Sequence, residues 1–242
     1  MSHTIWLYWE ELKPPYISLC VKTVFAHNKN VVLLDRASFD HLFTQDRDID
    51  IDPLGLVHKS DFIRAYLLKH YGGIYIDADC IVLRNLSDVL DMTQQFGFVG
   101  YRDPFGYMSC NFMASEMNGE VITEFYNRVC SAVRSKRPLE WLDIGSVPMD
   151  DVIACYKDRS FLLPTESVMP LSWNESEKLC VQRDDEEHEQ YFRHDAFCYM
   201  LSNNTIKSRD ETRILYHLTQ NQLLSDRYFI SFLFRRSLHK ES

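Results

Sequence analysis

The sequence predicts an α/β fold in which helices flank a mainly parallel central sheet, within a single domain spanning residues 1–242. Short apolar segments of strand length alternate along the chain with segments in which apolar residues have helical spacing. The first three elements come in the order strand, helix, strand, and two strands joined by a helix pair in parallel. A chain of 242 residues is also long enough to bury a substantial core.

The elements follow from local composition and spacing. Apolar and β-branched residues predict strands at 4–9, 31–34, 74–76, 96–101, 161–163 and 214–218. Apolar residues spaced three and four apart predict helices at 16–27, 61–70, 120–133 and 150–156. Residues 46–53 alternate acids with isoleucine and end in proline, so they predict a loop. The charge run at 184–189 (DDEEHE) is interpreted as a solvated loop.

The helix predicted at 61–70 has signals at both ends. Ser60 is a typical N-cap residue, and Asp61 would then lie at the positive end of the helix dipole. Gly72 and Gly73 end the helix, because glycine readily adopts the backbone angles found just beyond a helix. The strand at 74–76 follows at once and is expected at the centre of the sheet.

Composition excludes several classes of protein. The formal net charge is −9, so a broad interface with nucleic acid is not expected. The seven cysteines form no C-x-x-C pairs, and their odd number argues against a complete disulfide framework. The N-terminus does not read as a signal peptide, and no apolar run is long enough to span a membrane. These features predict a cytoplasmic protein.

Two aspartates, Asp77 and Asp79, close the predicted central strand. Carboxylates at this spacing can share a divalent cation, since Mg²⁺ and Mn²⁺ prefer oxygen ligands. Acidic residues are also common in turns after strands, and that alternative remains open for the motif alone.

The preceding helix carries a second chemically useful pair, Asp61 and Arg64. A spacing of three residues places both side chains on one face, from which they can reach the same ligand. The same spacing also suits an ordinary intrahelical salt bridge, and the helix by itself does not choose between the two roles.

Together these residues resemble a known group of enzymes. Ser60-Asp61-x-x-Arg64, followed by Tyr71-Gly-Gly-Ile-Tyr-Ile-Asp-Ala-Asp79, resembles the sugar-binding region of DXD glycosyltransferases. The block looks like that of glycosyltransferase family 32 and the capsular polysaccharide synthesis enzymes, and the clostridial glucosylating toxins are similar at a distance. Residues 5–10, 111–115, 162–164 and 169–173 also resemble that group, although the block at 60–79 is the specific part. The resemblance implies a Rossmann-like, GT-A-like single domain.

The resemblance also implies roles for individual residues. Asp79 would ligate Mn²⁺ or Mg²⁺ directly, and Asp77 would contact the metal through water or contact the ribose and sugar of the donor. Asp61 and Arg64 would hold the sugar hydroxyls, so these four residues are the expected catalytic set. The remaining expected contacts to the nucleotide-sugar donor are Tyr8, Trp9, Tyr75 and Asn111. Core packing remains the alternative for the aromatic residues, and a turn role for Asn111.

His217 resembles the late histidine that supplies a third metal ligand in these families. It ends the strand predicted at 214–218, and imidazole would favour manganese. The chain departs from the family here, because Gln220-Asn221-Gln222 stands where relatives commonly have Ser-Trp. Asp150 and Asp151 lie where relatives place acceptor contacts, but a helix-capping role is the preferred interpretation.

The resemblance implies a metal-dependent transferase that moves a sugar from a nucleotide-sugar donor, with a UDP-sugar expected, to a glycan or lipid-linked glycan. It further implies retention of anomeric configuration and a place in capsule or O-antigen polysaccharide synthesis. Two alternatives remain open. A haloacid-dehalogenase-like phosphohydrolase also has D-x-D after an apolar strand, and a nucleotide- or carbohydrate-binding module could keep the fold without turnover.

The tail at 227–240 (RYFISFLFRRSLHK) mixes aromatic residues with four cations. A helix within 227–242 could lie in a membrane interface with its cations toward anionic lipid, or close the domain by packing on it. Packing is the preferred interpretation. A membrane contact would place the protein at the inner face of the membrane, where a lipid-linked acceptor would lie.

Overall fold

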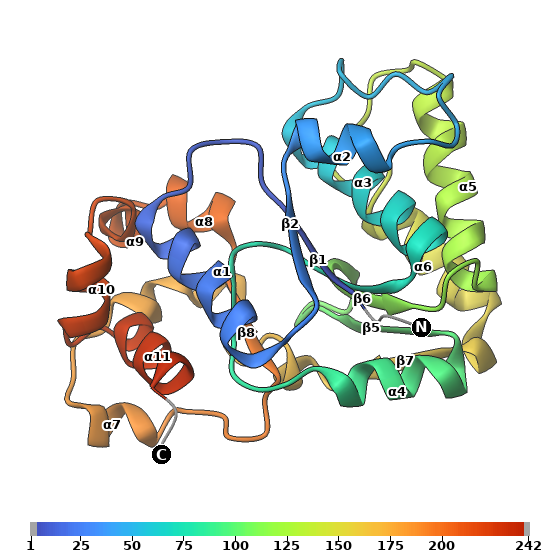
Figure 1. Cartoon of the computed structure of the whole chain (residues 1–242). Coiled ribbons are helices and arrows are strands. Elements are labelled where there is room, and N and C mark those ends of the chain that lie inside the picture. Colours follow the sequence, from blue (N-terminus) through green and yellow to red (C-terminus); the bar gives the residue numbers. More distant parts are fainter. Residues whose placement is uncertain (1–3, 240–242) are drawn as a thin grey trace. The chain divides into compact units, whose positions relative to one another are not determined.

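A computed structural model describes residues 4–239, which form two compact units. The first unit contains residues 4–10, Asn30–Ile76 and Ser87–Leu163, and the second contains Glu11–Lys29, Asp77–Leu86 and residues 164–239. Each unit is described by itself. Figure 1 shows the elements of both units along the chain.

The first unit contains a six-stranded sheet. In spatial order its strands are β2 (Val31–Leu34), β1 (Ile5–Tyr8), β3 (Gly73–Ile76), β6 (Met108–Ser115), β5 (Phe98–Arg102) and β7 (Ser160–Leu163). The β1–β2, β1–β3 and β5–β7 pairs are parallel, whereas β6 runs antiparallel to both its neighbours. A mainly parallel sheet with flanking helices confirms the predicted α/β class. Strand β3 lies at the centre of the sheet and residues 46–53 form a loop, both as predicted.

Helices surround this sheet. They are α2 (Arg36–Leu42), α3 (Leu56–Tyr71), α4 (Ser87–Phe96), α5 (Glu120–Arg134) and α6 (Ser146–Cys155), with a short 3-10 helix at Lys157–Arg159. Figure 1 shows α3, α5 and α6 on one side of the sheet and α4 on the other. Strand side chains alternate between faces, so Trp6 and Tyr75 join the buried cluster formed with α3 and α5, while Ile5 and Ile74 are buried on the opposite face.

Gly72 and Gly73 join α3 to β3 in a backbone that only glycine suits. Their φ angles are +67° and +99°, in the left-handed region that side chains disfavour. A Cβ atom on Gly73 would lie 2.1 Å from the carbonyl oxygen of Thr4, and one on Gly72 would lie 2.7 Å from the backbone nitrogen of Met117. The Gly-Gly pair therefore allows α3 to end directly against the sheet.

The second unit combines a two-stranded antiparallel ribbon with helices. The ribbon pairs β4 (Cys80–Val82) with β8 (Cys198–Met200). The helices are α1 (Pro15–His27), α7 (Asp185–Glu189), α8 (Asn203–Ser208), α9 (Asp210–Arg213), α10 (Gln220–Ser225) and α11 (Phe229–Leu238), and 3-10 turns occur at Thr165–Ser167, Trp173–Cys180 and Ile214–Tyr216.

Side chains from two helices fix the free edge of β4. The Thr23 hydroxyl of α1 accepts a hydrogen bond from the backbone nitrogen of Val82 at 2.9 Å. The Ser237 hydroxyl of α11 donates to the carbonyl oxygen of Val82 at 2.6 Å. Because β8 pairs with the other edge, β4 is bonded on both sides, and the segment that begins with Asp79 is held in place.

Three predicted elements begin or fold differently. Helix α3 begins at Leu56 after Gly55, so Ser60 is not its N-cap and Asp61 lies beyond the first turn. Helix α6 begins at Ser146, whose first turn accommodates Pro148, so Asp150 lies inside the helix and does not cap it. The segment predicted as a strand at 214–218 forms a 3-10 turn, because its buried residues Leu215 and Leu218 have helical spacing.

The acidic run is also a correction. Asp184 and Glu187 form a capping box that starts α7, and the side chain of His188 is buried. The Nε2 atom of His188 lies 2.9 Å from the carbonyl oxygen of Arg227, and its ring contacts Phe229. The run is therefore a short packed helix, because one histidine among the acids buries its ring.

The tail forms α11, which packs against α1 and α10 and buries Phe232, Leu233 and Phe234. Lys240 lies outside the described residues. Between residues 4 and 239, no helix has both the length and the apolar composition needed to cross a membrane. The seven cysteines are free thiols.

Candidate functional site

The first unit contains a buried ion pair on α3. The Arg64 NH1 atom lies 2.9 Å from Oδ1 of Asp61, and the two residues are 7% and 5% exposed. Removing two charges from water is costly unless each also gains hydrogen bonds, so a buried pair of this kind is not explained by stability alone. Asp61 and Arg64 therefore share one face of α3, as predicted, and that face is buried in the protein.

Ser60 and Tyr75 extend this pair toward the sheet. The NH2 atom of Arg64 donates to the Ser60 hydroxyl at 3.0 Å, and this hydroxyl lies 3.0 Å from the Tyr75 hydroxyl. The guanidinium carbon of Arg64 lies 5.1 Å from the centre of the Tyr75 ring, a cation–π contact. Arg64 is thus fixed by Asp61, Ser60 and Tyr75, and its planar guanidinium group is held in one orientation.

The beginning of α6 borders the Asp61 carboxylate. Gly145 is the N-cap residue of α6, and a Cβ atom there would lie 3.2 Å from Oδ2 of Asp61. A helix N-terminus has unpaired N–H groups and a partial positive charge, which favours a nearby carboxylate. Asp61 therefore lies between the Arg64 cation and the positive end of a ten-residue helix.

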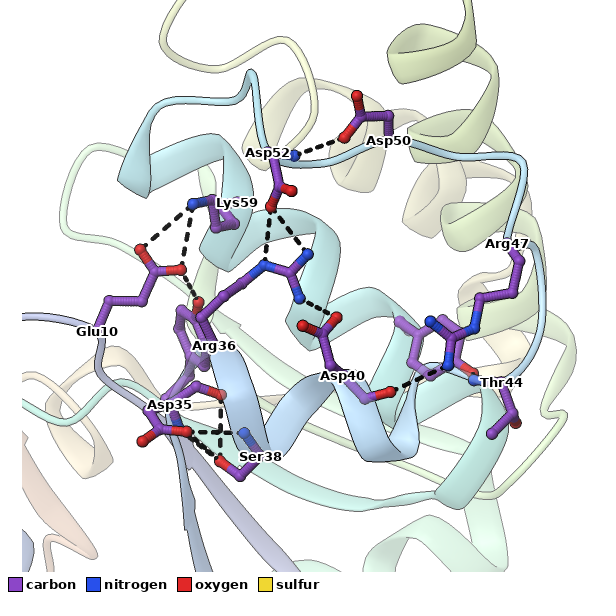
Figure 2. Close-up of polar contacts among 12 residues, drawn as sticks. Glu10, Asp35, Arg36, Ser38, Asp40, Thr44, Arg47, Asp50, Asp52 and Lys59 are labelled. Carbon is purple, nitrogen blue, oxygen red and sulfur yellow. Dashed lines mark hydrogen bonds and ion pairs between the residues drawn. The ribbon is translucent and has the colours of Figure 1, made fainter.

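Tyr8 and Glu10 lie at the carboxyl end of β1. Figure 2 shows Glu10 beside Lys59 of α3, whose Nζ atom lies 3.2 Å from Oε1 of Glu10. The Tyr8 hydroxyl donates to the same carboxylate, and burial together with this contact raises the pKa of Tyr8. Lys59 directly precedes Ser60, so Tyr8 and Tyr75 belong to one polar region at the ends of β1 and β3.

The neighbouring carboxyl end of β2 is occupied by structural contacts. Asp35 caps α2 through the backbone nitrogen of Ser38, and Arg36 binds Asp40 and Asp52 (Figure 2). These ion pairs are largely exposed and contribute little to stability individually. They fix the loop that leads to α3.

The polar atoms of Trp9 and Asn111 differ in their hydrogen bonding. The indole Nε1 of Trp9 is buried and has no hydrogen-bond partner among residues 4–239. The Asn111 Oδ1 atom accepts from Tyr101 at 2.7 Å and from Ser109 at 3.0 Å, which leaves its amide nitrogen as the donor. Asn111 lies on β6, next to the Ile76–Phe112 pair that ends β3. Buried polar groups nearly always have a partner, so the Trp9 Nε1 donor is the one of the two that needs an explanation.

Asp79 belongs to the second unit, where it is 8% exposed. Its Oδ2 atom accepts a hydrogen bond from the backbone nitrogen of Asn203 at 2.7 Å. The Asp79 carbonyl oxygen accepts from the nitrogen of Leu201 at 3.1 Å, continuing the β4–β8 ribbon by one pair. The ribbon thus brings the start of α8 to the Asp79 carboxylate.

Two tyrosines hold Asn203 in turn. The hydroxyl groups of Tyr16 and Tyr216 both donate to Oδ1 of Asn203, and their rings meet edge to face at 5.3 Å. Burial raises the pKa of both tyrosines, and the nearby Asp79 charge adds to the effect. The same two causes raise the pKa of the buried Cys20 thiol, so this group stays protonated at neutral pH.

Asp77, Asp79 and His217 are the residues expected to bind a metal ion. His217 is exposed and follows the 3-10 turn at Ile214–Tyr216. Within the described residues 4–239, no group of three or more His, Cys, Asp or Glu side chains is arranged to hold a metal ion. Mg²⁺ and Mn²⁺ are commonly bound by one or two carboxylates together with substrate phosphates, so the Asp77 and Asp79 carboxylates suit such an ion as protein ligands.

The structure brings Tyr8, Asp61, Arg64 and Tyr75 together in one unit and places Asp77, Asp79 and His217 in the other. Sequence reasoning missed Gly145 and the set formed by Tyr16, Asn203 and Tyr216. No local pattern indicates them, because Asn203 is 124 residues from Asp79 and is brought to it by strand pairing.

A protein-family model matches part of the chain. Residues 14–96 match the model of the "Glycosyltransferase sugar-binding region containing DXD motif". The matched region includes Asp61, Arg64, Tyr75, Asp77 and Asp79. No curated protein matches the chain significantly.

Solved structures with a similar arrangement include three glycosyltransferases. The PaToxG glycosyltransferase is 16% identical over 63% of this chain and 69% of its own length, with a TM-score of 0.47. GlyE of Streptococcus pneumoniae TIGR4 is 14% identical over 99% of this chain and 65% of its own length, with a TM-score of 0.49. The galactosyltransferase LgtC is 11% identical over 90% of this chain and 98% of its own length, with a TM-score of 0.47. The family match over residues 14–96 is the similarity that supports a glycosyltransferase.

Proposed function

We propose that this protein is a metal-dependent, GT-A-like glycosyltransferase that moves a hexose from a nucleotide sugar to a glycan or lipid-linked glycan acceptor. The observation that carries the proposal is the buried Asp61–Arg64 pair with Ser60 and Tyr75, within a segment that matches a DXD sugar-binding region. A UDP-sugar is the proposed donor, and surface polysaccharide synthesis is the proposed setting.

Asp61 and Arg64 would bind hydroxyl groups of the donor sugar. A sugar hydroxyl both donates and accepts, so a carboxylate beside a guanidinium can satisfy it at two points. The pair is already buried and oriented before the donor arrives, which reduces the entropy lost on binding. The Trp9 Nε1 donor, the Asn111 side chain and the rings of Tyr8 and Tyr75 would contact the rest of the nucleotide sugar.

Asp79 and Asp77 would hold Mn²⁺ or Mg²⁺, with His217 as a proposed third ligand. A bound ion of this kind neutralises charge on the departing diphosphate as a Lewis acid. Asp79 suits the role because Asn203 holds one of its oxygens in a fixed direction. The proton of the acceptor hydroxyl would pass to the leaving phosphate oxygen on the same face of the sugar. That route gives retention without an enzymic nucleophile, with polar groups stabilising the oxocarbenium-like state.

Hydrolysis of the donor, with water as acceptor, tests the proposal without knowledge of the glycan. Purified protein is incubated with UDP-glucose, UDP-galactose and UDP-N-acetylglucosamine, with and without Mn²⁺, and released UDP is measured. We expect release with at least one donor, dependent on Mn²⁺, and abolished in Asp79→Ala. Full metal-independent activity in that variant would overturn the proposal.

Two matched variants separate chemistry from folding. Asp79→Asn keeps an acceptor for the Asn203 nitrogen, so it should fold normally and still lose turnover. Asp88→Asn changes a surface aspartate in the first turn of α4 and should leave donor hydrolysis unchanged. In a phosphohydrolase the first aspartate of the motif, Asp77, would be the nucleophile, so equal phosphate release from simple phosphate esters in wild type and Asp77→Asn would exclude that role.

A further inference from the structure

The turn before α6 presents a large aromatic side chain to solvent. Trp141 is 58% exposed, and Leu142 beside it is also exposed. An exposed tryptophan on a surface leaves much of the free energy of burying an indole ring unused. An exposed aromatic residue on a fixed segment near a binding site can mark a surface that contacts a ligand.

The turn is fixed by its own hydrogen bonds. Oδ2 of Asp143 accepts from the Glu140 nitrogen at 3.0 Å and from Arg137 NH1 at 2.7 Å. These two contacts lower the pKa of Asp143, so it stays ionised at neutral pH and continues to accept both bonds. The Asp143 nitrogen donates back to the Glu140 carbonyl at 3.1 Å, and Ile144 is fully buried. Trp141 therefore stands at the tip of a closed turn with an anchored end.

Both ends of the turn lie against α3, one at His58 and the other at Asp61. The Nε2 atom of His58 lies 3.0 Å from the Glu140 carbonyl oxygen, and Gly145 abuts the Asp61 carboxylate. His58 and Asp61 are three residues apart on the helix, about 4.5 Å along its axis. Trp141 and Gly145 are four positions apart in the chain, so their Cα atoms are at most about 14 Å apart even if the segment is fully extended. The backbone of Trp141 therefore lies within about 14 Å of Gly145, which lies against the Asp61 carboxylate.

Other exposed apolar side chains belong to the first turn of α6 and to the β5–β6 hairpin, which is hydrogen-bonded to α6. Val147 is exposed in its first turn, and Phe105 and Tyr107 are exposed at the β5–β6 hairpin. Asp150 connects the hairpin to α6, because its Oδ2 atom accepts from the nitrogen of Met108 at 3.2 Å. The exposed apolar residues of this region, named here the α6 platform, are Phe105, Tyr107, Trp141, Leu142 and Val147.

We propose that the α6 platform binds the saccharide acceptor, with Trp141 stacking on a sugar ring next to the Asp61–Arg64 pair. This inference rests on the proposed function, since it assumes that Asp61 and Arg64 hold the donor sugar. The chemistry favours a saccharide, because a pyranose offers an apolar C–H face to an indole ring and hydroxyl groups to polar neighbours. The carboxylates of Asp143, in the same turn as Trp141, and of Asp150, on α6, would be such neighbours.

The size of the platform favours the same occupant. A stable protein interface buries roughly 800 Å² on each partner and presents twenty or more residues, whereas five side chains suit one or two sugar rings. The fixed turn also keeps Trp141 in one orientation, so stacking costs little conformational entropy.

The test compares Trp141→Ala with wild type in two assays on the full chain. Lactose, maltose, cellobiose and N,N′-diacetylchitobiose serve as soluble acceptors at fixed donor and Mn²⁺. We expect the KM for the best acceptor to rise about tenfold, the loss of one good aromatic stack, while donor hydrolysis in the absence of saccharide stays within twofold. Trp141→Phe should recover part of the acceptor affinity. Trp173→Phe changes another exposed tryptophan and should alter neither assay.

Saccharide binding is also followed by tryptophan fluorescence, which requires no turnover. We expect the four saccharides to perturb emission in wild type and the effect to vanish in Trp141→Phe. An unchanged acceptor KM in Trp141→Ala, or no fluorescence response to any saccharide, would overturn the platform while donor hydrolysis keeps the proposed function intact. If the wild-type protein hydrolysed none of the donors, that result would instead reject the proposed function. A shift from dimer to monomer in Trp141→Ala by sedimentation velocity would show that a second copy covers the platform and also reject the inference.

Discussion

The backbone nitrogen of Asn203 donates a hydrogen bond to Oδ2 of Asp79 at 2.7 Å. The Asn203 side chain in turn accepts from Tyr16 and Tyr216, so a helix start and two aromatic rings fix the second aspartate of the DXD motif. One carboxylate oxygen of Asp79, Oδ2, is therefore held by a hydrogen bond within the protein. We expect the orientation of the second oxygen, Oδ1, to depend on this network of Asn203, Tyr16 and Tyr216.

Tyr216→Phe tests the network. We expect Mn²⁺ affinity, measured by calorimetry with UDP present, to fall about tenfold, because partners that orient a metal ligand usually affect affinity on that scale. Tyr126→Phe is the matched control, since its hydroxyl bonds Asp46 at 2.9 Å in the other unit. Both variants should lose about 1 kcal/mol of unfolding free energy, but only Tyr216→Phe should bind Mn²⁺ more weakly. Equal Mn²⁺ affinities would contradict a positioning role.

Arg64→Met should destabilise the fold strongly. It leaves the Asp61 carboxylate buried without its cation, so we expect a loss of about 3–5 kcal/mol in unfolding free energy, measured by urea denaturation. Adding Asp61→Asn removes the stranded charge, and the double variant should be more stable than Arg64→Met alone. Strictly additive losses would show that the two side chains are not energetically coupled.

Gly145→Ala should impair donor use more than stability. The added methyl group would lie 3.2 Å from the Asp61 carboxylate and should displace it. Gly119 offers a control, because it is the N-cap of α5 and its Cβ would also lie 3.2 Å from the nearest atom, the carbonyl oxygen of Glu116. We expect the KM for the donor to rise in Gly145→Ala and not in Gly119→Ala. Similar donor KM values would argue against Asp61 as a sugar contact.

His70 should make stability sensitive to acid. Its ring lies 4.4 Å from Tyr66 and 5.3 Å from Tyr126, and burial followed by the nearby Lys69 charge lowers its pKa. Asp46 acts in the opposite direction and does not reverse the shift. Because the unfolded chain binds the proton more readily, stability is lost as pH falls below about 6.5 toward the folded-state pKa. His70→Phe should reduce this loss between pH 7 and 5 in thermal melts. An identical pH dependence in the variant would rule His70 out.

Gly73→Ala should disrupt the junction of α3 and β3. The position has φ of +99°, and a methyl group would overlap the Thr4 carbonyl. We expect a loss of about 3 kcal/mol or more in unfolding free energy. Gly106→Ala tests the backbone effect alone, since Gly106 also has positive φ but has open space around its Cβ. A cost in Gly73→Ala no greater than in Gly106→Ala would exclude the overlap.

Periodicity and local chemistry were enough to predict much of the first unit. Apolar runs and the Gly-Gly stop identified β1, β2, β3 and α3, since these signals act between residues that are neighbours in the chain. The i, i+3 spacing of Asp61 and Arg64 correctly placed them on one face, because helix geometry alone decides that relation. The start of α3 was predicted too late, because Gly55 is a weaker N-cap signal than Ser60.

The sequence by itself determined the α/β class and the central strand, because the strand and helix periods are local properties. Only the tertiary structure decided that Gly145 abuts Asp61, that Asn203 and two tyrosines hold Asp79, and that the 214–218 segment is a turn. Those relations depend on contacts between segments far apart in the chain, and such contacts leave no pattern in the neighbouring residues.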